Sequence, residues 1–314
     1  MLKLDLTCLE NQKSVAVALS GGGDSMALTH MLSKWATQND AQIHALTVDH
    51  NLRKNSAAEA TTVGGYIKKF PNVMHHILKW DDGIGENTAL MEKARAARYA
   101  LMIEYCKAHD IQTLAIGHHG DDQIETFLFR LSKGSGVDGL ACMPNWVERD
   151  GVHLYRPLLG FSHYDLIQYC KSHQLKWVED PSNKNSQFAR PRLRKALEDE
   201  GLTTKRMGKT VQRMAEARDA IQWLVQRAMS EAVSVNGDTI QWDVLIDYPR
   251  AVTVRVLQQM IEQNGKDGGG YPPKLERVEA IVATIRPSKS ATLHGCMITL
   301  SKDGKRLEIK QAAA

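Results

Sequence analysis

The chain of 314 residues is long enough for one sizeable domain and a smaller one, and its 43% hydrophobic and 24% charged residues are ordinary for a globular protein. Its formal net charge of +4 permits an anionic partner without requiring one. No apolar run approaches the ~18 residues of a membrane span, and the N-terminus lacks the apolar core of a signal peptide. The five scattered cysteines never form C-x-x-C, which argues against a disulfide framework, a zinc ribbon or a cysteine-bound cluster. We therefore expect a reduced, cytoplasmic protein with no membrane partner.

The first half of the chain alternates strand-like and helix-like segments, which predicts a parallel sheet covered by helices on both faces. The expected strands are residues 15–19, 43–48, 74–78 and 113–116. The expected helices are residues 26–36, 57–69 and 88–109. In such sheets ligands bind beyond the carboxyl ends of the strands, and three of these strands run into polar clusters. Those clusters, which we expect to meet in one crevice, are residues 20–25, 49–53 and 117–122.

Beyond about Asp199 the sequence changes to longer helical patterns. Apolar residues at three- and four-residue spacing predict one amphipathic helix over residues 207–228. Further helical stretches lie near residues 249–264 and before Ala283, and a β-like tail covers residues 291–300 and 306–309. The expected organisation is therefore an α/β catalytic domain over residues 1–200 and a smaller, mainly helical domain over residues 201–314 that ends in a β-hairpin.

A glycine-rich loop, Ser20-Gly21-Gly22-Gly23-Asp24-Ser25, follows the first expected strand and precedes a helical pattern. This is where α/β proteins hold phosphates, because glycines let backbone N–H groups turn inward and the helix presents its positive end. Asp24 beside a phosphate is repulsive unless a cation bridges the two, which suggests Mg²⁺. The loop lacks the lysine of a Walker A motif and the spacing of a dinucleotide fingerprint. A pyrophosphate cradle is the functional interpretation, and an ordinary strand-to-helix turn is the alternative.

Two histidines and two acids follow the fourth expected strand. If a helix starts near residue 121, Asp122 and Glu125 share an exposed face near its N-terminus. There they can bind Mg²⁺ or a cationic substrate and assist proton transfer, or they merely complement the helix dipole. His118 and His119 are candidate metal ligands, acid–base groups or phosphate contacts, with a hydrogen-bonded structural role as the alternative.

Basic residues gather in two further places. Arg95 and Arg98 share one helix face and can clamp a phosphate or a carboxylate, unless they form a solvated basic face. A second, longer basic stretch begins near residue 183 and has Phe188 nearby, which suits a nucleic-acid backbone and one stacked base. A solvated helix is again the alternative, although Pro191 argues against one uninterrupted helix.

Together these segments resemble the tRNA(Ile)-lysidine synthetase family, a branch of the PP-loop (N-type) ATP pyrophosphatases. The matching segments occur in the same order and cover about two-thirds of the chain: residues 20–25, 48–53, 94–99, 117–126, 131–136, 139–143, 156–159, 179–183 and 190–194. Pro191 stands where the family usually has Asn, and the chain is similar to the short form of the family, which lacks the most C-terminal domain.

The resemblance implies a doubly wound, mostly parallel sheet of the adenine-nucleotide α-hydrolase-like type. It also implies an ATP-dependent carbon–nitrogen ligase that acts in two steps on the wobble cytidine of an isoleucine tRNA with a CAU anticodon. ATP adenylates the base at its 2-position oxygen and releases pyrophosphate. The side-chain amine of free L-lysine then displaces AMP and forms lysidine. The implied cofactors are ATP and Mg²⁺, the implied partners are tRNA and L-lysine, and a homodimer is a further expectation.

Residue roles follow from the same resemblance. Catalysis is expected from Asp24, His118, Asp122 and Glu125, with Mg²⁺ at Asp24 and Asp122. Binding of lysine or the adenylate is expected from Arg98, Asp122 and Glu125. The expected ATP-binding residues are Ser20, Gly21, Gly22, Gly23, Asp24, Ser25 and His50. The expected tRNA-binding residues are Arg190, Arg192, Arg194 and Lys195.

Three other functions remain open at this point. A PP-loop tRNA thiolase would activate the same kind of base for sulfur, but the similar thiolases usually carry C-x-x-C pairs. A two-metal phosphoesterase could use His50 with the histidines and acids of residues 118–122, and it leaves the glycine-rich loop unexplained. A non-catalytic RNA-binding module would use only the basic stretch.

Overall fold

A computed structural model of the chain describes residues 2–49, 56–80, 90–178, 203–234, 236–265 and 272–312. The chain folds into two compact units, Met1–Ala215 and Glu216–Ala314. The boundary falls inside the long helix α8 (Thr204–Ala232), so the first part of this helix belongs to unit 1 and the rest to unit 2. None of the described helices is both long and apolar enough to cross a lipid bilayer.

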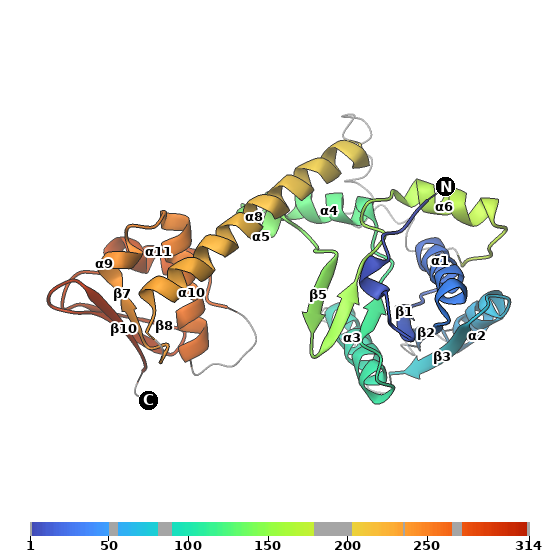
Figure 1. Ribbon diagram of the computed structural model, residues 1–314, viewed down its shortest axis with the longest axis horizontal. Helices are drawn as coiled ribbons and strands as arrows, with labels where there is room; N and C mark the ends of the chain where they lie inside the picture. The colour runs from blue at the N-terminus through green and yellow to red at the C-terminus, as the bar shows by residue number, and fades with distance from the viewer. Residues whose placement is uncertain are drawn as a thin grey trace. The chain divides into compact units, whose positions relative to one another are not determined.

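A six-stranded sheet, in the order β3-β2-β1-β4-β6-β5, forms the centre of unit 1 (Figure 1). Five strands are parallel, and β5 is antiparallel to β6 at the edge. The strands are β1 (Ser14–Ala18), β2 (Gln42–Asp49), β3 (Val73–Lys79), β4 (Thr113–Ala115), β5 (Trp146–Arg149) and β6 (Val152–Tyr155). The strand after β1 lies on one side of it and β4 lies on the other, and such a reversal opens a crevice at the carboxyl ends of the strands.

Helices cover both faces of this sheet. The helices α1 (Gly23–Asn39), α2 (Ser56–Ile67) and α6 (His163–Ser172) lie on one face and α3 (Leu90–Ala108) lies on the other. A short 3₁₀ turn, η1 (Thr7–Leu9), precedes the sheet, and α4 (Gly120–Leu131) and α5 (Val137–Leu140) pack with each other beyond β4. Successive residues of β1 point to opposite faces, so Val15 and Val17 pack in the cluster that holds α1, α2 and α6, while Ala16 packs with α3. The predicted doubly wound, mostly parallel sheet is confirmed.

The β5–β6 hairpin was not expected from the hydrophobic pattern. Each of its strands has only four residues, which is too short for a clear alternation. Its signal is the turn instead, because Asp150 and Gly151 both adopt positive φ angles, 51° and 79°, as tight hairpin turns require.

Unit 2 contains the rest of α8, further helices and a four-stranded antiparallel sheet in the order β7-β10-β9-β8. Its other elements are β7 (Thr239–Gln241), α9 (Trp242–Leu245), α10 (Arg250–Asn264), α11 (Leu275–Thr284), β8 (Ser290–Leu293), β9 (Cys296–Leu300) and β10 (Arg306–Gln311). The expected terminal hairpin is therefore wrong in extent. A turn at His294 and Gly295, with φ angles of 54° and 72°, splits the expected strand 291–300 in two, and the three-residue β7 adds a fourth strand.

Candidate active site

The glycine-rich loop lies between the end of β1 and the first turn of α1. Gly21 has a φ of +87°, and a Cβ atom on it would lie 2.4 Å from Cγ2 of Val63 on α2. A Cβ on Gly23 would lie 2.5 Å from Cδ1 of Ile167 on α6. The positive φ makes glycine the favoured residue at Gly21, whereas a side chain at Gly23 would have to displace the end of Ile167. The N–H groups of the first turn of α1 are left for a ligand, as at any helix N-terminus.

The two serines of the loop hold its shape. The Ser25 hydroxyl donates to the carbonyl oxygen of Gly22 at 2.9 Å, and the Ser20 and Ser25 hydroxyl oxygens lie 3.2 Å apart. Both side chains also line the cavity described next, so they can turn a hydroxyl toward a bound phosphate.

A cavity of about 460 Å³ opens at the carboxyl ends of β1 and β2. This volume lies within the usual range for a small-molecule site, ~300–1,000 Å³. Its walls combine apolar side chains from β2, α2 and α3 with polar groups from the glycine-rich loop and the end of β4. The apolar lining includes Leu46, Val48, Ala60, Val63, Met102 and Ile116, and the polar lining includes Ser20, Asp24, Ser25, Arg98 and His118. The lining thus offers apolar side chains for an aromatic base and polar groups for the charged parts of a ligand.

His118 is held as a neutral imidazole. Burial lowers its pKa to about 4, the carboxylate of Asp122 opposes this shift, and Arg156, Arg95 and Arg98 add to it. Its Nδ1 atom is buried without a hydrogen-bond partner among the residues that the structure describes. Near pH 7 His118 can therefore donate or accept one hydrogen bond in the cavity, but it does not add a positive charge there.

Three arginines lie near enough to His118 to lower its pKa, and two of them are desolvated. Burial lowers the pKa of Arg98 and of Arg156 below the ordinary value of arginine. Arg156 donates to the carbonyl oxygen of Pro144 at 3.0 Å, and its Nε atom has no partner within the described part of the chain. A buried cation is costly unless an anion compensates it, so this side of the site suits a phosphate or carboxylate.

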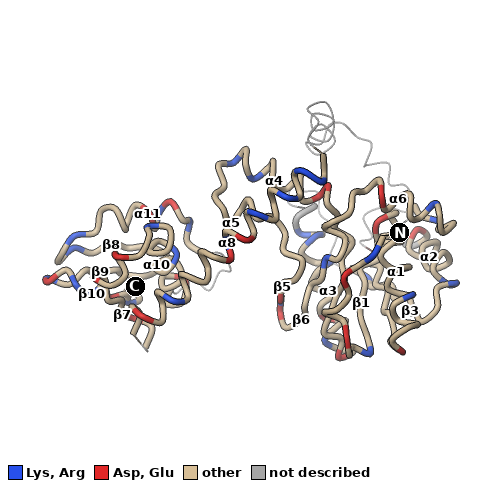
Figure 2. Tube along the Cα trace, turned by 45° about the horizontal axis from the view of Figure 1, so that its top comes forward, with Lys and Arg blue, Asp and Glu red and all other residues tan. Residues whose placement is uncertain are grey.

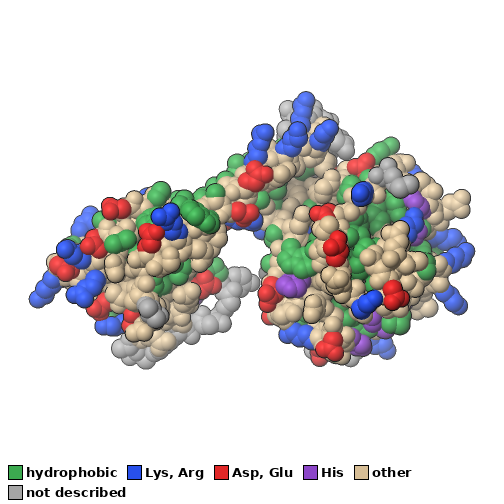
Figure 3. Space-filling model, viewed as in Figure 1, with side chains coloured by type: hydrophobic (Ala, Val, Ile, Leu, Met, Phe, Trp, Pro, Cys, Tyr) green, Lys and Arg blue, Asp and Glu red, His purple; other side chains and the backbone are tan. Residues whose placement is uncertain are grey.

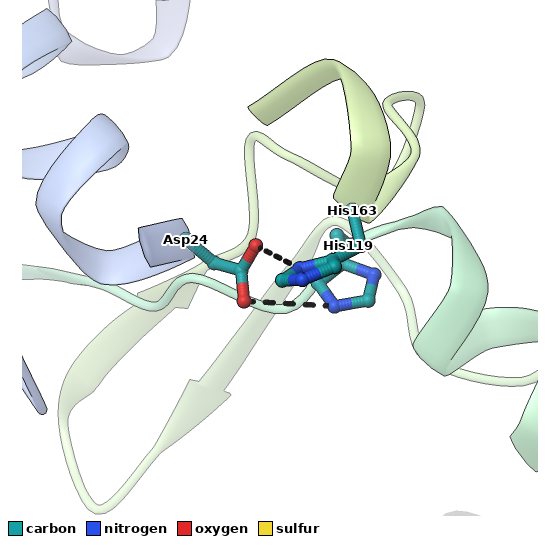
Figure 4. A group of neighbouring side chains, drawn as sticks. All are labelled: Asp24, His119 and His163. Atoms are coloured by element: carbon teal, nitrogen blue, oxygen red, sulfur yellow. Dashed lines mark hydrogen bonds and ion pairs between the residues drawn. The ribbon is translucent and has the colours of Figure 1, made fainter. Parts of the chain in front are cut away.

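Asp24 lies in a cluster with two histidines (Figure 4). Its Oδ1 lies 2.8 Å from Nδ1 of His163, the first residue of α6, and its Oδ2 lies 3.7 Å from Nε2 of His119. Asp121 links this cluster to α8. Its carboxylate accepts hydrogen bonds from the backbone N–H of His163 at 2.8 Å and from the Thr204 hydroxyl at 2.6 Å.

The two predicted acids of α4 differ in exposure. Asp122 caps the helix by accepting from the backbone N–H of His119 at 3.0 Å, and its Oδ2 lies 3.6 Å from Nε2 of the same histidine. Glu125 is only 4% exposed, so the expectation that both acids share an exposed face is wrong. Other parts of α4 are covered as well, by α8 through Met207 and by the segment at Met143, whose backbone bonds the side chain of Gln123.

The structure thus brings Asp24, His118, Asp122 and Arg98 to the carboxyl end of the sheet. His50, Arg190, Arg192, Arg194 and Lys195 lie outside the described residues, so their predicted roles stay predictions.

Sequence reasoning missed the roles of His163, Asp121 and Arg156. Of these, Asp121 and Arg156 belong to matching segments, 117–126 and 156–159, whereas His163 belongs to none. His163 is 139 residues from Asp24, and no motif spacing links the two.

Comparison with known proteins agrees with this geometry. A family model described as a PP-loop domain matches residues 3–200. The tRNA(Ile)-lysidine synthase of Wolbachia pipientis wMel is 37% identical over 295 residues, which cover 90% of this chain and 68% of that protein. This chain belongs to the tRNA(Ile)-lysidine synthase family. The family's protein from Ruegeria pomeroyi is 34% identical over 91% of this chain and 68% of its own length, and the one from Rhodopseudomonas palustris is 32% identical over 92% and 88%.

Among solved structures, the U34-tRNA thiolase NcsA from Methanococcus maripaludis, described with its [4Fe-4S] cluster, is similar with a TM-score of 0.58. The match covers 68% of this chain and 75% of that one at 18% identity, so it shows a shared fold alone. Membership of the lysidine synthase family favours a PP-loop, ATP-dependent ligase over the thiolase alternative.

Proposed function

We propose that this chain joins L-lysine to the wobble cytidine of an isoleucine tRNA with a CAU anticodon, at the expense of ATP. The observation that carries the proposal is the glycine-rich loop in a chain of the lysidine synthase family. Asp24 of this loop lines a cavity of about 460 Å³. ATP use follows from the PP-loop domain. The lysine substrate, Mg²⁺, a homodimer and action in the cytoplasm are parts of the proposal.

The cavity accounts for ATP in two parts. The adenine ring would lie against apolar side chains such as Val48, Val63 and Met102, and the phosphates would lie over the N–H groups of the loop. Mg²⁺ fits here, because it prefers oxygen ligands and is usually bound by substrate phosphates together with one or two carboxylates. Asp24 and Asp122 can supply these carboxylates. When bound, it would neutralise charge on the departing pyrophosphate.

The second step needs a neutral amine. The lysine side chain has a pKa of ~10.4, so about one molecule in a thousand is neutral near pH 7. Asp122 and the buried Glu125 would bind the ammonium group, and one carboxylate would take its proton as the nitrogen attacks C2 of the base. The new C2–N bond forms while the bond from C2 to the adenylate oxygen breaks, and AMP leaves. Arg98 and Arg156 would hold the lysine carboxylate or the adenylate phosphate.

The first part of α8 carries a basic surface that would bind tRNA. Met207 and Val211 pack against α4, whereas the other side of this stretch carries exposed lysines and arginines. They are Lys205, Arg206, Lys209 and Arg213. The trace and the space-filling view show basic residues gathered over the start of α8 (Figure 2; Figure 3). A row of cations on one helix face would neutralise tRNA phosphates, together with the predicted contacts of residues 190–195.

Incorporation of labelled lysine into a transcript of the CAU-anticodon isoleucine tRNA tests the proposal. We expect incorporation that requires ATP and that is absent from a methionine tRNA transcript with the same anticodon. ATP consumption to AMP without lysine incorporation would contradict the choice of nucleophile. Hydrolysis of phosphate esters without ATP would favour the phosphoesterase alternative instead.

A further inference from the structure

The cluster of Asp24, His119 and His163 has the composition of a transition-metal site. One ligand atom from each residue lies within 4.8 Å of the other two. Three separate elements supply them: the first turn of α1, the residue before α4 and the first residue of α6. Figure 4 shows the two imidazole rings converging on the Asp24 carboxylate.

The distances around His119 are those of groups that share an ion. Its Nε2 lies 3.7 Å from Oδ2 of Asp24 and 3.6 Å from Oδ2 of Asp122. Both separations exceed the ~3.2 Å limit of an ordinary N–H···O bond. They are close to the roughly 3.4 Å that separates two ligands of a tetrahedral ion bound at about 2.1 Å.

The surroundings of His119 fit the same role. The residue is 3% exposed, and its other ring nitrogen, Nδ1, has no hydrogen-bond partner among the described residues. Oδ2 of Asp121 lies 3.8 Å from this nitrogen. Histidines that bind a metal through one ring nitrogen usually direct the other to a carboxylate, so Asp121 is placed to orient the ring once Nε2 binds an ion.

The donor set separates this ion from the one that accompanies ATP. Mg²⁺ takes oxygen ligands and leaves imidazole largely unused, whereas Zn²⁺ and its neighbours bind imidazole well. We propose that Asp24, His119 and His163 form a binding site for a divalent transition-metal ion of the Zn²⁺ class. Bound there, such an ion would compete with Mg–ATP for Asp24. The proposal goes beyond the ligase activity and does not depend on it.

Calorimetric titration of the chelator-treated full chain with ZnCl₂, without ATP, lysine or tRNA, tests the site. We expect one Zn²⁺ per chain, and at least a hundredfold weaker binding of MgCl₂ under the same conditions. Co²⁺ provides a second readout, because its visible absorption reports histidine ligation.

Variants then locate the ion. His163→Ala should weaken Zn²⁺ binding tenfold or more. Because the His163 side chain is partly exposed, we expect this variant to fold. His109→Ala, which removes an exposed histidine at the end of α3, is the matched control and should bind as the parent does. His119→Gln, checked by thermal melting, is the second variant. The proposal is overturned if Zn²⁺ does not bind, if neither variant of the cluster weakens it, or if Mg²⁺ binds equally well.

Discussion

The two units of this chain bury different kinds of side chain. In unit 1 the buried residues include eleven polar or charged side chains, most of them at the carboxyl end of the sheet or in the first turns of α1 and α4. They are Ser25, Thr29, Ser33, His44, Thr47, Asp49, Thr113, His119, Gln123, Glu125 and Arg156. In the described part of unit 2, Thr253 alone is of this kind, and its hydroxyl donates to the carbonyl oxygen of Leu245 at 3.1 Å.

This difference indicates that unit 1 carries the groups for the reaction and that unit 2 is mainly structural. Burial of polar groups costs free energy unless they are hydrogen-bonded or used by a ligand, and several of those in unit 1, such as Ser25, Thr47 and His119, lie in the cavity or in the Asp24 cluster. Unit 2 is held by apolar contacts among α8, α10, α11 and its sheet, which stabilise a fold without preparing it for a reaction. Substitutions in unit 1 should therefore change activity first, and substitutions in unit 2 should change stability first.

The largest expected effect is on activity, from Asp24→Asn. Loss of the carboxylate charge should reduce lysine incorporation by a factor on the order of 10²–10³, as for other groups that stabilise developing charge. The free energy of unfolding should change little. Asp40→Asn removes the same charge at the exposed end of the same helix and should leave incorporation intact. Equal activity of the two variants would remove Asp24 from the site.

The next effect tests unit 2. Leu257 on α10 is fully buried in its apolar cluster, so Leu257→Ala should lower the free energy of unfolding by about 2–5 kcal/mol. Urea denaturation followed by circular dichroism measures this, with Ile246→Ala, at a 53% exposed position, as the control. At a temperature where the variant is folded, its ATP affinity should equal that of the parent. A clear drop in ATP affinity would contradict the claim that unit 2 contributes stability rather than activity.

Gly21→Ala should give a smaller loss, of about 1–3 kcal/mol in unfolding free energy, because a φ of +87° strains any side chain. Contact with Val63 adds to this cost, and ATP affinity should fall as the loop shifts. Gly22→Ala is the matched comparison, since Gly22 has a φ of −71° and its Cβ would lie 3.7 Å from the nearest atom. It should keep the parent's stability, and equal losses in both variants would contradict the cradle geometry.

A pH effect of about 1 kcal/mol is expected from His118. Its pKa falls from 6.5 in the unfolded chain to about 4 in the fold, so the unfolded state binds a proton first as the pH drops. This histidine therefore costs no stability above pH 6.5, and the cost grows as the pH falls from 6.5 toward 4. Between pH 6 and pH 5 the parent should lose about 1 kcal/mol more than His118→Gln in denaturant melts. Parallel curves would refute a neutral, buried His118.

The smallest effect concerns tRNA binding. Lys209→Ala should reduce the slope of log affinity against log salt by roughly one phosphate contact, about 0.7–0.9 units. Filter binding at several salt concentrations measures the slope, and Lys302→Ala, an exposed lysine in a turn of unit 2, is the control. If Lys302→Ala flattened the slope and Lys209→Ala did not, the contact with tRNA would have to be assigned to unit 2 instead of unit 1.

Much of unit 1 could be predicted because its signals are local. The apolar run before Ser20 and the alternating segments up to residue 116 each carry their own periodicity, and the observed strands begin and end within a few residues of the expected ones. The glycine-rich loop was visible for the same reason, since its conformation depends on its own residues.

The unpredicted part of the site depends on tertiary contacts. His163 reaches Asp24 only because α6 packs against α1, and its sequence context, with Ser162 and Asp165 forming a capping box, signals a helix start and nothing more. The packing of α8 on α4 through Met207 and Val211 is likewise a contact that no local pattern contains. The sequence predicted helices at α1, α4 and α8 but not at α6, and it predicted none of their pairings.

The packing of α8 on α4 also determines how far the chain can be shortened from its C-terminal side without damage to unit 1. The PP-loop match ends at residue 200, but the compact unit continues to residue 215. A protein shortened to residue 200 would lose Thr204, which bonds Asp121, and would expose the face of α4 that Met207 and Val211 cover. The shortest self-sufficient catalytic fragment should therefore retain the first turns of a helix whose remainder belongs to the neighbouring unit.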